Sequence, residues 1–82
     1  MTRGVLLFHT TTAVMRAEKS LLNAGMQIQL IPTPREFSSD CGISIRFEWT
    51  DIAKIKTCIS QDTLEFDSIQ EIVDPPRQDQ IP

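Results

Sequence analysis

The sequence predicts a single α+β domain with the element order β-α-β-β-α-β. Three observations lead to this prediction. Residues 13–23 and 52–59 each carry apolar side chains at spacings of three, four and seven, as amphipathic helices do. Residues 43–49 alternate between apolar and polar side chains, which is typical of a half-buried strand. A loop with two prolines, residues 32–42, separates this strand from the preceding one.

The first two elements are a buried strand and a capped helix. Val5–Phe8 is an unbroken apolar run, as expected for a strand covered on both faces. Thr10, Thr11 and Thr12 offer N-caps for a helix near residues 12–24, and Gly25 is expected to end that helix.

Alternation and capping residues also predict the remaining two strands and the second helix. Residues 26–30 alternate apolar residues with glutamine and predict a second strand. Thr50 or Asp51 caps a second helix near residues 51–60, and residues 64–73 form a weaker last strand. We therefore expect one domain over residues 1–73, followed by a flexible tail, residues 74–82, that contains three prolines.

Right-handed crossovers and a central hairpin arrange these elements as an antiparallel sheet of order 4-1-3-2, with both helices on one face. This is the ferredoxin-like arrangement, which hosts many unrelated functions. Side-chain parity then buries Phe47 with Ile55 and Cys58 and turns Arg46 and Glu48 away from the helices.

Composition narrows the function classes. A net charge of −3 argues against nucleic acid as a partner, and no apolar run approaches the roughly 20 residues that span a membrane. The first ten residues do not resemble a secretion signal, so we expect a cytoplasmic protein. With one histidine and two cysteines, we expect free thiols and no metal or other cofactor.

The loop PTPREFSSDCG is the strongest candidate for a functional site. It carries charged residues and Cys41 in a segment that cannot join a helix or sheet interior. Topology brings Cys41 close to His9 and to the threonines that begin the first helix. If the strand register extends back without a bulge, Cys41 points toward the helix N-terminus, which favours its thiolate form. We expect the thiol to be at least partly accessible.

Each candidate residue also has a structural interpretation. Cys41 is either a functional thiol or a small residue in a tight turn, and Arg35 either acts on the thiol or is a solvated loop charge, like Glu36. His9 is either a polar residue at the helix start or a base for Cys41. Gly42 is expected to permit close backbone approach or a positive φ. The threonines are caps first and anion-binding groups second.

Two stretches, FHTTTAVMRAEKSLLNAG and LIPTPREFSSDCGISIRF, are similar to the selenium/sulfur (Se/S) carrier protein-like family of small bacterial domains. The shared features are a strand that ends in Phe8, a threonine-rich turn, a helix with Ala-Glu-Lys, and a Pro-x-Pro-Arg-Glu loop that ends in Cys41 and Gly42. The resemblance implies a persulfide or selenopersulfide on Cys41. His9 departs from the family, which has a small residue or proline there.

Two function hypotheses result. The first is a carrier that takes sulfur or selenium from a donor protein and passes it to an acceptor protein. The second is a non-catalytic binding or assembly module in which Cys41 is structural. A thiol enzyme is a weaker third option, because no convincing Cys–His–acid set is present. The sequence leaves a homodimer open, through the open sheet face or through the second-strand edge with Gln27 and Gln29.

Overall fold

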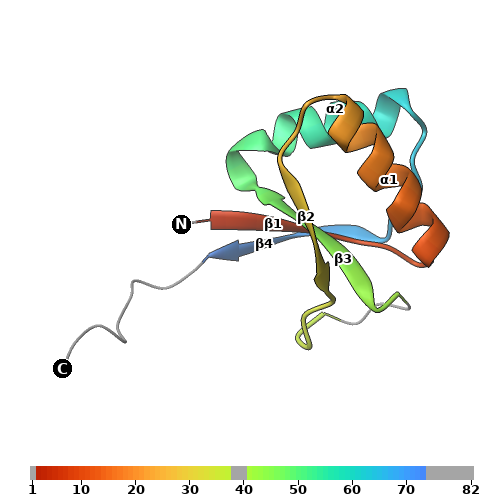
Figure 1. The fold of residues 1–82 in the computed structure, drawn as a ribbon. Coiled ribbons are helices and arrows are strands. Elements are labelled where there is room, and N and C mark those ends of the chain that lie inside the picture. Colours follow the sequence, from red (N-terminus) through yellow and green to blue (C-terminus); the bar gives the residue numbers. More distant parts are fainter. Residues whose placement is uncertain (1, 38–40, 74–82) are drawn as a thin grey trace.

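A computed structural model describes residues 2–37 and 41–73, so the expected tail lies outside the described residues. Its elements are, in order, β1 (Thr2–Leu7), α1 (Thr11–Asn23), β2 (Ile28–Pro32), β3 (Ile43–Glu48), a 3₁₀ turn (Trp49–Asp51), α2 (Ile52–Gln61) and β4 (Ser68–Val73). The strands pair in the order β2-β3-β1-β4, and both helices lie on one side of the sheet (Figure 1). This order is 4-1-3-2 read from the other edge, so the predicted class and topology are confirmed.

The strand pairs are all antiparallel, and β1 lies between β3 and β4. The main difference from expectation is the start of β4, which begins at Ser68 rather than Leu64. Leu64 instead belongs to the turn after α2, where its N–H donates to the Ile59 carbonyl at 3.0 Å. Thr63 lies in this turn with a φ of 51°, which is outside the range of a regular β-strand.

The core lies between the sheet and the two helices. Ile45 and Phe47 of β3, together with Phe8 directly after β1, meet Leu21 and Ile55 from the helices, and all five are buried. Glu48 is exposed and Arg46 is half-buried, as the parity of β3 predicts for the opposite face. No helix in the described part of the chain is long and apolar enough to cross a membrane.

The prediction that Cys58 is buried is wrong. Cys58 is half-buried and packs against the border of the core. Ile55 and Ile59 occupy the centre of the apolar face of α2, and the helical turn places Cys58 on its flank. Its neighbours there include Ala24, Met26 and Thr57, with which it lines a groove between α2 and the segment that follows α1.

Close packing of β1 against β3 requires a glycine. Gly4 lies opposite Phe47 in the sheet, and a Cβ atom on Gly4 would stand 2.1 Å from the Cζ atom of the Phe47 ring. Carbon atoms cannot approach that closely, so the ring would have to leave a site where only 3% of Phe47 is exposed.

We therefore expect Gly4→Ala to lower the free energy of unfolding by about 1–3 kcal/mol, measured by urea denaturation. Gly42→Ala is the matched control, because a Cβ at Gly42 would meet no atom within 4 Å. Equal stability losses in the two variants would contradict this account of the β1–β3 packing.

Candidate functional site

The β2–β3 loop and the start of α1 meet at Cys41. Cys41 lies two residues before the start of β3, and Thr11 is the first residue of α1. The Thr11 Oγ1 atom lies 3.9 Å from the Cys41 Sγ atom, within reach of a hydrogen bond to sulfur. The topology predicted this proximity between residues 30 positions apart, and the structure confirms it.

The three threonines at this turn have different roles. Thr10 is the N-cap of α1, because its side-chain oxygen accepts the Ala13 N–H at 3.1 Å. Thr11 turns toward the thiol. Thr12 is exposed and lies beside Arg16 on another side of the helix. Only Thr11 is therefore placed to interact with Cys41 through its side chain.

Cys41 is only 4% exposed, so the expectation of a partly accessible thiol is wrong. The reason is the strand register. The Thr33 N–H donates to the Gly42 carbonyl at 2.9 Å and continues the β2–β3 pairing past Pro32 and Ile43 without a bulge. Cys41 thus keeps the inward parity of β3 and joins the core cluster.

A threonine–serine pair fixes the backbone of Cys41. The Thr33 hydroxyl donates to the Cys41 carbonyl at 2.8 Å and lies 2.7 Å from the Ser44 hydroxyl. Because a hydroxyl has one proton, Ser44 must be the donor in the second contact. Ser44 is fully buried, so its hydroxyl requires this partner. The sequence analysis did not single out either residue. The signals were a threonine between two prolines, and a serine at a polar position of the alternating strand.

Gly42 does not have the predicted role. A positive φ among the glycines occurs only at Gly25, and, apart from Gly42 and its two chain neighbours, no atom of residues 2–37 and 41–73 lies within 4 Å of the position where a Cβ of Gly42 would be. Neither backbone strain nor close approach therefore requires a glycine beside Cys41.

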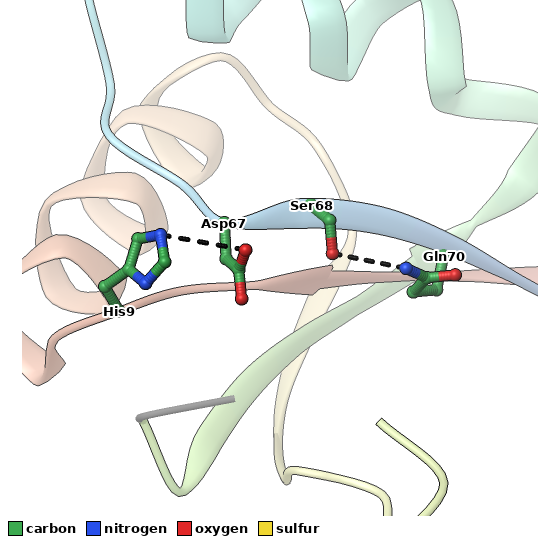
Figure 2. Close-up of polar contacts among 4 residues, drawn as sticks. All are labelled: His9, Asp67, Ser68 and Gln70. Carbon is green, nitrogen blue, oxygen red and sulfur yellow. Dashed lines mark hydrogen bonds and ion pairs between the residues drawn. The ribbon is translucent and has the colours of Figure 1, made fainter. Parts of the chain in front are cut away.

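His9 lies on the other side of the β1–α1 turn. Its Nε2 atom is 3.7 Å from the Asp67 Oδ1 atom at the start of β4, and Figure 2 shows the ring directed at that carboxylate. The backbone of Asp67 is held in place because its N–H donates to the Leu7 carbonyl at 2.7 Å. This contact favours the interpretation of His9 as a polar residue at the helix start.

Arg35 and Glu36 are exposed on a turn in which the Phe37 N–H donates to the Pro34 carbonyl at 3.1 Å. An action of Arg35 on the thiol stays a prediction. Both cysteines are free thiols. Across residues 2–37 and 41–73, no three His, Cys, Asp or Glu side chains gather in a way that could hold a metal ion.

A family model described as "Putative Se/S carrier protein-like" matches residues 3–71. The chain belongs to this family. The match runs from β1 into β4 and includes the β2–β3 loop with Cys41, as the resemblance of the two stretches indicated. Comparison with curated proteins finds no match.

The Thr33–Ser44 pair leads to a prediction about the environment of the thiol. Thr33→Val removes the donor to the Cys41 carbonyl and leaves the buried Ser44 hydroxyl without an acceptor. We expect a loss of about 1–3 kcal/mol in the free energy of unfolding and faster alkylation of Cys41 by iodoacetamide.

Thr33→Ser keeps the hydroxyl and is the matched control, with Cys58→Ser as the background for the alkylation measurements. Unfolding in urea and the alkylation rate should both separate the two variants. A valine variant that behaves like the serine variant would remove the proposed role of this pair.

Proposed function

We propose that this protein carries sulfur or selenium as a persulfide or selenopersulfide on Cys41 and transfers the atom to a partner protein. The observation that carries the proposal is the family match over a segment that includes the cysteine loop. The contact between Thr11 and Cys41 supports it, because it holds the thiol at the N-terminal end of α1.

The chemistry needs a donor that already carries the atom, such as a protein persulfide. The Cys41 thiolate attacks the outer sulfur of the donor, a new S–S bond forms, and the donor's own S–S bond breaks. The electron pair of that bond leaves on the donor cysteine as a thiolate, so no separate oxidant is required. In the second step a nucleophile of the acceptor attacks the outer sulfur and releases the Cys41 thiolate.

Residues at the start of α1 suit an anionic sulfur. The Thr11 hydroxyl can donate to the sulfur of Cys41 once that sulfur has lost its proton. The Ala13 N–H is occupied by the Thr10 cap and the Val14 N–H by the Thr10 carbonyl at 3.3 Å. The positive end of the helix dipole nevertheless acts on any charge held beside this turn.

The burial of Cys41 gives the proposal a specific form. With 4% of the residue exposed, a donor must displace neighbouring side chains before its sulfur can reach the thiol. A docked protein can provide the binding energy for this displacement, whereas a low-molecular-weight persulfide makes too few contacts to do so. We therefore expect loading from a protein donor to be faster than loading from a low-molecular-weight persulfide at the same concentration. The same burial shields a bound sulfur atom from solvent reductants between the two transfers.

A second function is favoured by the same burial. Free cysteines in protein interiors usually act as small hydrophobic residues, and Cys41 packs within the core cluster. In that case the domain is a binding or assembly module and Cys41 is structural. Chemical loading of the thiol separates the two functions.

The decisive experiment incubates the full chain with a cysteine desulfurase and cysteine and locates the adduct by peptide mass spectrometry. We expect one added sulfur on the Cys41 peptide and its removal by a reductant. Cys58→Ser should load as the unaltered protein does, and Cys41→Ser should not load.

Cys58 is an internal control for nonspecific persulfidation, because it is the more exposed of the two thiols. Selective loading of the less exposed cysteine would therefore reflect recognition by the donor rather than access. Equal loading of both cysteines, or loading of neither, would exclude the carrier function and favour the binding module.

A further inference from the structure

The outer side of β2 is an unpaired sheet edge. β2 is the terminal strand of the sheet and pairs with β3 alone (Figure 1). The bond from the Thr33 N–H to the Gly42 carbonyl sets the phase of this antiparallel pair. Backbone groups alternate in direction along a strand, so those of Ile28, Leu30 and Pro32 are directed to the open edge.

This edge has little of the protection that edge strands usually carry. No residue of β2 is charged, and Pro32 at its end is the one protective feature, because it removes a single N–H donor from the edge. The backbone groups of Ile28 and Leu30 remain available to another strand.

Exposed apolar side chains flank the same edge. Met15 and Leu22 of α1 are 63% and 52% exposed, Leu30 is 42% exposed and Ile43 is 38% exposed. We call these four residues the β2-edge surface. Leu30 and Ile43 also line a shallow apolar depression with Pro32.

The position of Met15 and Leu22 follows from the helix period. They are seven residues apart and share a side of α1 with Thr11, which faces Cys41 beside β3. Arg16 lies on the opposite flank, against the turn after α2. Met15 and Leu22 are therefore on the flank of α1 nearer to β3 and β2.

We propose that the β2-edge surface pairs with the same surface of a second copy of this chain. The two β2 strands run antiparallel about a two-fold axis at Leu30 and continue the sheet across both molecules. Each Leu30 then donates to and accepts from Leu30 of the second copy, and each Ile28 N–H reaches the Pro32 carbonyl of the second copy. One bond is missing from this register: Pro32 has no N–H, so it cannot donate to the Ile28 carbonyl of the second copy.

Self-complementarity favours a second copy over an unrelated strand. The same two-fold axis places the α1 helices antiparallel, so Met15 approaches Leu22 of the second copy. β2 itself carries no charged residue, so pairing of two copies brings no like charges together along the strand. The apolar side chains of the β2-edge surface therefore meet apolar side chains of the second copy. The proposal does not depend on the carrier function.

The test measures the molar mass of the full chain by sedimentation velocity over a range of concentrations. We expect a monomer–dimer equilibrium. Leu30→Lys places two like charges opposite each other on the axis and should raise the dissociation constant at least about tenfold. Phe66→Lys is the matched control: Phe66 is 37% exposed but lies before β4, away from β2, and its replacement should leave the equilibrium unchanged.

The register has its own test in a background that lacks both native cysteines. Leu30→Cys should form an intermolecular disulfide under mild oxidation, because Leu30 faces itself, whereas Ile28→Cys should not. A monomer at every concentration, a dimer insensitive to Leu30→Lys, or cross-linking of Ile28→Cys instead would overturn the proposed pairing. A monomer whose Ile28 and Leu30 amides become protected from hydrogen exchange only with another protein would assign the edge to that protein.

Discussion

The antiparallel register between β2 and β3 is the constraint on which the rest of this structure depends. It runs without a bulge from the pair Ile28–Phe47 to the bond between Thr33 and Gly42. Because side chains alternate between the two faces of a sheet, this register decides the direction of every residue from Cys41 to Glu48. A shift of β3 by one residue against both of its neighbours would turn Cys41 to the open face and, because Gly4 of β1 pairs with Phe47, would also remove the Phe47 ring from Gly4.

The register also explains how a loop cysteine becomes part of the core. A thiol in a polar loop is ordinarily available to solvent, but Cys41 continues the inward phase of β3 and reaches the start of α1. Thr33 and Ser44 secure this position from the opposite face, because the Thr33 hydroxyl donates to the Cys41 carbonyl and accepts from the Ser44 hydroxyl. Access to the thiol therefore requires movement of the side chains that surround it.

The two cysteines illustrate that exposure and function need not coincide. Cys58 is the more accessible thiol, yet it lies on the flank of α2 in a groove with mainly small and apolar neighbours. Cys41 is the less accessible, yet it contacts the first residue of α1 and lies within the segment matched by the family. A carrier built in this way would select its donor by docking.

The sequence by itself determined the fold class, the strand order and the proximity of Cys41 to Thr11. These follow from local periodicity and from the short list of topologies that a β-α-β-β-α-β chain can adopt. Tertiary structure alone decided the burial of Cys41, the half-burial of Cys58, the contact of His9 with Asp67 and the absence of any conformational need for Gly42. Exposure depends on which atoms distant segments bring together, and hydrogen bonds between hydroxyls depend on tenths of an ångström. Neither quantity is encoded in the spacing of residues along the chain.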